Sequence, residues 1–185
     1  MTHSDSPRFL KPPPDMNSPG PTATVPRAER HGALLGLGRT FLGHSNSCEL
    51  YQTIFVETGK VVELTGFLLS IYDDQSDIAT VVFSVDDGRE SNSGLTYRGS
   101  DSHVLRTGTP TAIEDQTVPF PEDGGSGAAR STLSAPLLLR DRVMGALTVY
   151  SSHADAYDAT DSELLGRVAD LASVALENMR HVEEL

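Results

Sequence analysis

The sequence predicts an α+β domain built around a largely antiparallel sheet, and three observations lead to this fold class. Apolar residues recur at helical spacing after a proline-rich start, and they do so again toward the C-terminus. Between these segments lie two pairs of stretches in which apolar and polar residues alternate, and a short polar turn joins the members of each pair. Alternation indicates strands, and short turns join antiparallel neighbours. Helices on either side of such hairpins are typical of an α+β fold.

Residues 1–26 are predicted to form a disordered tail or linker ahead of a single domain that spans residues 27–185. This stretch contains seven of the eleven prolines and few apolar residues. Proline fixes φ and supplies no backbone donor, so the stretch has little from which to build a packed element. A motif for a proline-binding partner is the less favoured alternative.

Two helices are expected next. Over residues 27–43, leucine and phenylalanine recur at helical spacing. The second helix begins at Asn46, because Glu49 follows three residues later as in a capping box. Its apolar residues continue to about Leu64, with Gly59 as a weak point.

Two strands follow at residues 66–74 and 78–88, joined by a polar turn at 73–77. Each strand has one apolar face and one face that mixes hydroxyls with apolar groups, so the sheet is expected to carry helices on one side and a less uniform layer on the other. The alternation assigns to the apolar face Phe67, Leu69, Ile71, Ala79, Val81 and Phe83, and to the mixed face Leu68, Ser70, Tyr72, Thr80 and Ser84.

Residues 87–130 are rich in Gly, Ser, Asp and Thr, and elements are expected here to be short. They comprise a helix at about Ser100–Thr107, a brief strand at Thr111–Ile113, and an exposed loop over residues 119–129. Two longer strands follow at about Thr132–Leu139 and Val143–Ser151.

A long helix is predicted for the C-terminal part, at about 161–185. Thr160 and Glu163 have the spacing of a capping box, which would begin it. An apolar seam then repeats about every 3.5 residues to the end of the chain. The seam residues are Leu165, Val168, Ala172, Ala175, Met179 and Val182.

Composition excludes several classes of function. The formal net charge of −12 at pH 7 argues against binding to nucleic acid or anionic membranes, because phosphate binding relies on clustered lysine and arginine. There is no apolar run of the roughly 18 residues that a membrane span needs, and no secretory signal begins the chain. Cys48 is the one cysteine, and a lone thiol fits a reducing compartment. We therefore expect a cytoplasmic location.

Motifs for catalysis, nucleotide binding and metal binding are incomplete. Residues 124–128 lack the final glycine of a hydrolase elbow, and Gly59-Lys60 lacks the earlier glycine of a P-loop. The six histidines show no paired metal spacing. The acidic stretches at 73–77 and 86–88 lack the spacing of a calcium loop, and turn chemistry explains them better. The sequence therefore predicts no metal and no catalytic residue, and it identifies no cofactor.

The order and spacing of four segments resemble a GAF domain: "GFLLSIYDD", "GTPTAIED", "RSTLSAPLLLRDRVMGALTVYSS" and "YDATDSELLGRVADLASVALENMRHVEEL". The run Ser134-Ala135-Pro136, followed by a polar turn and a Val-Met-Gly-Ala-Leu strand, is the most telling part. The resemblance covers roughly residues 27–185. It implies a central antiparallel six-stranded sheet, with the N- and C-terminal helices on one face and a ligand pocket on the other. One departure is Arg142, which stands where these domains often place glycine, so a different turn type is expected there.

The resemblance places the mixed face of the sheet under the pocket and makes residues 94–110 its lid. The lid combines aromatic, cationic and hydroxyl groups, as small-molecule sites commonly do, although Ser100 or Asp101 could equally be the N-cap of a short helix. The expected core of the second hairpin is Leu133, Ala135, Leu137, Leu147 and Val149. The candidate ligand-binding residues are Ser70, Tyr72, Ser84, Tyr97, Ser100, Asp101, His103, Ser134, Thr148 and Tyr150.

Three functions remain open at this point. The favoured one is a non-enzymatic sensory domain of a bacterial signalling protein that binds a small molecule or relays a signal. Its terminal helices would pair in a homodimer, and the last helix would lead to a kinase, cyclase or other output domain. The second is a ligand-free dimerisation module whose pocket is filled by Tyr72, Tyr97 and Tyr150. The least favoured is a thiol-dependent enzyme at Cys48, similar to the GAF proteins that reduce methionine sulfoxide with several cysteines.

Overall fold

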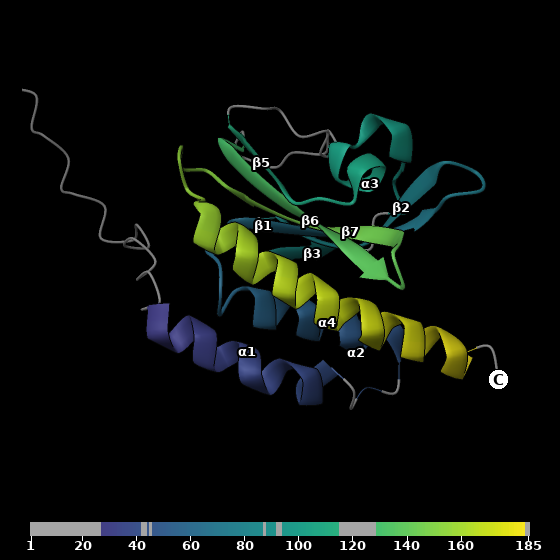
Figure 1. Cartoon of the computed structure of the whole chain (residues 1–185), viewed down its shortest axis with the longest axis horizontal. Coiled ribbons are helices and arrows are strands. Elements are labelled where there is room, and N and C mark those ends of the chain that lie inside the picture. Colours follow the sequence, from purple (N-terminus) through teal and green to yellow (C-terminus); the bar gives the residue numbers. More distant parts are fainter. Residues whose placement is uncertain are drawn as a thin grey trace, which may run out of the picture.

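The computed structural model contains a seven-stranded antiparallel sheet with helices on both faces (Figure 1). The structure describes residues 27–41, 44, 46–86, 88–91, 94–114 and 129–183. The predicted tail at 1–26 lies outside these residues, as does nearly all of the predicted loop at 119–129. No helix within the described part of the chain is long and apolar enough to cross a membrane.

The elements follow the predicted order, with two additional short strands and one 3-10 helix. They are α1 (Arg27–Phe41), α2 (Ser47–Thr58), β1 (Gly66–Asp73), β2 (Ile78–Asp86), β3 (Arg89–Ser91), β4 (Thr96–Arg98), the 3-10 helix η1 (Gly99–Asp101), α3 (His103–Thr107), β5 (Thr111–Glu114), β6 (Ser131–Leu139), β7 (Arg142–Ser151) and α4 (Ala159–Glu183).

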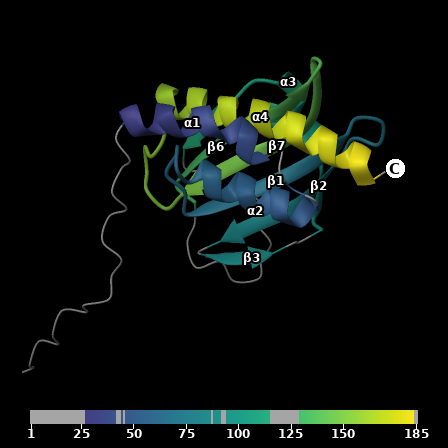
Figure 2. The same cartoon turned by 90° about the horizontal axis from the view of Figure 1, so that it is seen from below.

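The β1–β2 hairpin and the β6–β7 hairpin meet at the centre of the sheet, where β1 pairs with β7. The strand order is β3-β2-β1-β7-β6-β5, and β4 also pairs with β2. The central pair, β1 and β7, matches residues 66–71 with residues 145–150. Helices α1, α2 and α4 cover one face, which Figure 2 shows from the helix side, while α3 lies on the other face (Figure 1). This arrangement confirms the predicted fold class, with seven strands instead of six.

The main core lies between the sheet and helices α1, α2 and α4, and we call it the first cluster. Phe55, Phe67 and Phe83 form an aromatic group at its centre, with ring centroids 5.4 to 6.2 Å apart. The predicted core of the second hairpin is confirmed, because all five residues are fully buried here. Other fully buried members are Leu37, Leu50, Ile54, Leu69, Leu165, Val168, Ala169 and Ala172.

A smaller core lies on the opposite face of the sheet, beneath α3, and we call it the second cluster. Its buried members are Ala79, Val104, Leu105 and Ala146, and half-buried Tyr72, Tyr97 and Val143 pack against them. The predicted short helix is therefore present, although it is split into η1 and α3. Ser102 is the N-cap of α3, instead of Ser100 or Asp101.

A β-bulge interrupts the alternation of β2. Leu69 pairs with Phe83, but the next residue of β1, Ser70, pairs with Val81. Val82 is therefore an extra residue that has no partner in the register. One extra residue moves the earlier side chains of a strand to the opposite face of the sheet.

The bulge makes part of the predicted face assignment wrong. Ala79 packs in the second cluster instead of under the terminal helices. Val81 lies opposite Ser70, on the α3 side, and Thr80 lies opposite Ile71, on the helix side. The residues beyond the bulge keep their predicted face, because Phe67, Leu69, Ile71 and Phe83 all belong to or pack on the first cluster.

Helix α2 ends at Thr58, six residues before the predicted end at Leu64. Gly59 is its C-cap, and the Gly59 N–H donates to backbone carbonyls of the last turn. Val61 and Val62 are nevertheless buried in the first cluster. These two valines are apolar because the segment between α2 and β1 is buried. They do not continue the helix.

Helix α4 is capped two residues earlier than predicted. The Asp158 carboxylate accepts hydrogen bonds from the N–H groups of Thr160 and Asp161 at 2.7 and 3.0 Å. The Asp161 carboxylate in turn accepts from the Asp158 N–H at 3.0 Å. This is a reciprocal cap of the kind predicted for Thr160 and Glu163. The seam is buried up to Met179, but Val182 is 62% exposed, so its last member does not join the core.

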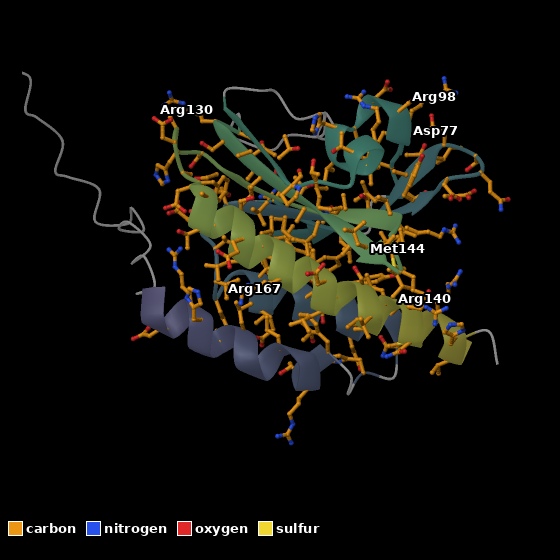
Figure 3. All side chains as sticks on the ribbon, viewed as in Figure 1. Asp77, Arg98, Arg130, Arg140, Met144 and Arg167 are labelled. Carbon is orange, nitrogen blue, oxygen red and sulfur yellow. The ribbon has the colours of Figure 1, made fainter. Side chains whose placement is uncertain are left out.

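The β6–β7 hairpin turns through two residues in the left-handed region, Arg140 (φ 49°) and Asp141 (φ 63°). Leu139 pairs with Arg142, so these two residues alone form the loop. Two positive φ values match a type I′ turn, which favours Asn and Gly. The left-handed positions of the turn are therefore the two residues before Arg142. Figure 3 shows Arg140 at this end of the hairpin.

Candidate functional site

A row of half-buried side chains crosses four strands on the α3 side of the sheet. Register places Ser134 of β6 beside Thr148 of β7, Thr148 beside Leu68 of β1, and Leu68 beside Ser84 of β2. The Ser134 and Thr148 hydroxyls are 2.9 Å apart and hydrogen-bonded. We call these four residues the hydroxyl row. The sequence specifies it by simple alternation, because their neighbours Leu133, Ala135, Leu147 and Val149 point into the first cluster.

Tyr150 borders the hydroxyl row along one side, two residues beyond Thr148 on β7. It is buried, and its hydroxyl donates to Asp86 Oδ1 of β2 at 2.5 Å. To reach Asp86 from β7, its ring lies across Gly66 of β1, where any Cβ would overlap the ring. Thr132 of β6 pairs with Tyr150 on the other side and is buried as well.

Ser70 and Tyr97 lie on the other side of the row, where Ser70 is two residues beyond Leu68 on β1. The Ser70 hydroxyl and the Tyr97 hydroxyl are 2.7 Å apart and hydrogen-bonded. Tyr97 belongs to β4 in the lid and packs on the second cluster. Its burial raises the pKa of its phenol, so the hydroxyl stays protonated and can donate. Beyond this pair the sheet face is filled by the protein's own side chains.

Tyr72 and Ser100 are hydrogen-bonded to Asp77. The Tyr72 hydroxyl donates to Asp77 Oδ1 at 3.1 Å, and the Ser100 hydroxyl donates to Asp77 Oδ2 at 2.8 Å. The Ser100 hydrogen bond lowers the pKa of the Asp77 carboxyl, whereas desolvation and the nearby carboxylate raise the pKa of Tyr72. Both hydroxyls therefore serve an internal contact in this structure.

Asp101 and His103 lie on the outer surface of the lid, where both are exposed. His103 Nδ1 is 2.8 Å from the Thr111 hydroxyl of β5. The ten candidates thus fall into three places: the hydroxyl row with Tyr150, the contacts between lid and sheet, and the lid surface. They do not converge on one point.

Sequence reasoning missed Asp77, Gly66 and Asp86 as parts of this face. Gly66 is the first residue of β1, and glycine in a strand often lies where another group packs closely against the backbone. Asp77 stands in a turn of three acidic residues, and turn chemistry accounts for its type without pointing to Ser100, which lies 23 positions away. Asp86 gives no local signal.

Metal binding and thiol chemistry find little support on this face. Within the residues that the structure describes, no group of three or more His, Cys, Asp or Glu side chains could hold a metal ion. Cys48 is exposed in the first turn of α2. Since α2 packs on the helix side of the sheet, the thiol lies on the opposite side from the lid (Figure 1).

A shallow groove lies on the helix side, between α1 and α4. Its lining residues are His31, Gly32, Leu34, Arg167, Asp170 and Leu171; Figure 3 labels Arg167 near α1. At the N-terminal ends of the same helices, Arg30 and Asp161 form an ion pair at 2.8 Å, and both side chains are largely buried. This pair fixes the two helices to each other.

The family model for the GAF domain matches residues 49–177, which include the whole sheet, the lid and most of α4. The chain belongs to the GAF domain family. This confirms the resemblance seen in the sequence. The comparison with curated proteins found no match.

Several solved structures share the fold at low identity. The GAF domain of a phosphoenolpyruvate-protein phosphotransferase from Coxiella burnetii has a TM-score of 0.70 at 12% identity, covering 85% of this chain and 98% of that one. The free methionine-R-sulfoxide reductase of Neisseria meningitidis, solved with its substrate, has a TM-score of 0.67 at 16% identity, covering 83% and 92%. The chromophore-binding domain of a bacteriophytochrome from R. palustris has a TM-score of 0.65 at 12% identity, covering 84% and 62%.

Proposed function

We propose that this GAF domain is a sensory module that binds a small molecule over the hydroxyl row. The observation that supports the proposal is the division of the α3 side of the sheet. The second cluster fills one part with the protein's own side chains, while the hydroxyl row keeps three hydroxyl groups and Leu68 half-buried on rigid strands. An apolar surface with a few fixed polar groups is the usual composition of a small-molecule site.

Within this proposal, Ser134, Thr148 and Ser84 contact the ligand, and Tyr150 borders the site on one side. Ser70 and Tyr97 form the boundary toward the second cluster. Tyr72 and Ser100 act through Asp77, and direct ligand contacts by Asp101 and His103 stay predictions. No residue is assigned a catalytic role.

The signal would leave through the terminal helices. We propose that α1 and α4 pair with their copies in a cytoplasmic homodimer and that α4 leads to an output domain. The groove between α1 and α4 supports this, because Leu34 and Leu171 give it an apolar lining and Val174 of α4 is 48% exposed. A ligand changes the equilibrium between two arrangements of these helices only if it binds one arrangement more tightly than the other, and the size of the change is set by that difference in affinity.

A thermal-shift screen of small metabolites, followed by native mass spectrometry, tests ligand binding. The matched variant is Ser134→Ala/Thr148→Val, which removes both members of the hydrogen-bonded pair and so should change the stability of the free protein little. The ligand-induced rise in Tm should disappear in this variant. It should persist in Thr53→Val, a change in α2 on the helix side. A metabolite that raises Tm equally in all three proteins would bind elsewhere and would contradict the proposed site.

A ligand-free dimerisation module is the second candidate, and the second cluster is the observation that favours it. Tyr72 and Tyr97 fill part of the predicted pocket, as this alternative requires. A dimer in native mass spectrometry, combined with no metabolite that shifts Tm, would favour this function over sensing.

A further inference from the structure

The end of the lid that carries η1 and α3 is attached to the turn between β1 and β2 through one residue, Asp77. Three hydrogen bonds meet at its carboxylate. Oδ1 accepts from the Ser100 N–H at 2.9 Å and from the Tyr72 hydroxyl at 3.1 Å, and Oδ2 accepts from the Ser100 hydroxyl at 2.8 Å. The Arg98 guanidinium lies 3.8 Å from Oδ2. Figure 3 shows Asp77 and Arg98 together beside α3.

The backbone at this attachment is adapted to it. Asp77 has φ 56°, the left-handed region that Asp and Asn tolerate better than most residues. Its carbonyl also accepts the Gly99 N–H at 3.1 Å. Gly99 has no room for a side chain, because a Cβ would overlap the Tyr72 ring and crowd Asp77 Oδ1. Several features unusual for a surface turn therefore serve this one contact.

The attachment decides where α3 lies on the sheet. Ser100 lies in η1, two residues before Ser102, the N-cap of α3. Val104 and Leu105 of α3 supply half of the buried members of the second cluster. α3 has only five residues and cannot be stable alone. Its position must come from packing in the second cluster and from its attachments at either end.

We propose that Asp77 is the positioning residue that holds η1 and α3 against the sheet, and that release of its hydrogen bonds lets α3 lift and opens the second cluster to the ligand. The part of this proposal that concerns the ligand rests on the proposed function. The part that concerns Asp77 and the position of the lid does not depend on any ligand. The low pKa of the Asp77 carboxyl supports it, since the charged form is the one that accepts all three hydrogen bonds. Asp77 thereby sets the size of the site: the hydroxyl row alone when it is engaged, and the row together with the second cluster when it is released.

Hydrogen exchange of the whole chain, followed by mass spectrometry, tests the proposal without a ligand. In Asp77→Asn the left-handed backbone is retained, while the charge and one acceptor are lost. We expect the amides of residues 99–107 to exchange about tenfold faster, as loss of a hydrogen bond to a charged group implies. The amides of β6, β7 and α4 should keep their protection, which also shows that the variant is folded.

The matched control is Asp74→Asn, in the same acidic turn, where the carboxylate pairs only at the surface with Arg142 at 3.1 Å. This variant should leave the exchange of residues 99–107 unchanged. Unchanged lid exchange in Asp77→Asn, or equal loss of protection throughout the domain, would overturn the proposal.

Ser100→Ala separates positioning from general loss of stability. It removes one donor to Asp77 without touching the turn. If both residues act through the same contact, Ser100→Ala should speed lid exchange by itself and add little in the Asp77→Asn background. Fully additive effects would contradict a shared contact. A screen that finds no ligand would remove the proposed function and leave these exchange results standing, so the two failures are distinguishable.

Discussion

The two faces of the sheet are packed in different ways. The first cluster is formed by three helices and four long strands, Phe67 and Phe83 of its aromatic centre are almost fully buried, and its seam along α4 is almost entirely apolar. The second cluster has four buried residues beneath a five-residue helix, and a carboxylate at its edge holds that helix in place. Segments with few buried contacts open at the lowest free energy. The face with the first cluster should therefore stabilise the fold, and the face with the second cluster should open more easily.

The largest effect is expected from Leu165→Ala in the first cluster. Leu165 is fully buried in α4 against the sheet. A cavity at such a site costs about 4 kcal/mol of unfolding free energy. Urea denaturation followed by circular dichroism should show one cooperative transition at a lower midpoint. A loss under about 1 kcal/mol would mean that this face is as adaptable as the other.

A somewhat smaller loss is expected from Gly66→Ala, which tests the rigidity of the face beneath the hydroxyl row. The added methyl would overlap the Tyr150 ring and break its hydrogen bond to Asp86. Overpacking of this kind costs about 3 kcal/mol. The control is Gly36→Ala in α1, where nothing lies within 4 Å of the added methyl. This control should stabilise the protein, since alanine favours helix by about 0.5–1 kcal/mol. Equal urea midpoints for the two variants would contradict the described position of Tyr150.

The same chemical change in the second cluster should cost less and act locally. Leu105→Ala removes a buried leucine of α3, and about 2 kcal/mol, the low end for such changes, is expected because the lid can settle into the space. Hydrogen exchange should speed up in residues 99–107 and remain slow in α4. If Leu105→Ala and Leu165→Ala lowered protection in the same residues, the two clusters would form one cooperative unit.

Acid should loosen the lid. The pKa of Asp77 is lowered below the ordinary 3.8, chiefly by the Ser100 hydrogen bond. Its contribution to stability is therefore complete above pH 3.8, and it is lost as the pH falls through the lower value of the folded state. Tyr72, Arg98, Asp73 and Asp74 are the other ionisable groups near this contact.

The Ser100 amide signal in a nuclear magnetic resonance titration reports this step directly. It should shift with a midpoint below pH 3.8 in the natural sequence, and that shift should be absent in Asp77→Asn. A midpoint at or above pH 3.8 would show that the hydrogen bonds from the lid do not stabilise the charged form of Asp77.

The smallest effect is expected from Cys48→Ser. The thiol is exposed in α2 on the helix side, and surface changes of this kind alter stability by less than about 0.5 kcal/mol. Ligand-induced Tm shifts should be unchanged. Methionine sulfoxide reductase activity present in the natural sequence and lost in Cys48→Ser would instead support the thiol-dependent enzyme.

The sequence predicted the parts of the fold that repeat locally and missed those that depend on a partner. The second hairpin was assigned correctly to its two faces, because its middle residues alternate without interruption from Leu133 to Leu137. The first hairpin was assigned correctly only beyond the bulge, because Val82 looks like any other strand residue until its pairing with β1 is known. Asp158 and Asp161 have the same spacing as Thr160 and Glu163, and local pattern alone does not choose between the two caps.

The candidate site shows the same limit. Ser134, Thr148 and Ser84 were placed on one face by alternation, and register then brings them into one row. Tyr72 and Ser100 were chosen for their chemistry, but Asp77 engages both hydroxyls from a turn that sequence patterns connect with neither. Contacts of this kind depend on how a loop returns to the sheet, which periodicity does not encode.

The pairing of β1 with β7 also sets the order of events during synthesis on the ribosome. β1 and β2 can form their hairpin early, but the other edge of β1 has no partner until β7 leaves the exit tunnel. Until then β1 exposes unpaired backbone groups beside the apolar side chains that belong to the first cluster, a surface that invites pairing with other chains. Since α4 follows β7 in the chain, the strand that completes the sheet and the helix that covers it emerge one after the other.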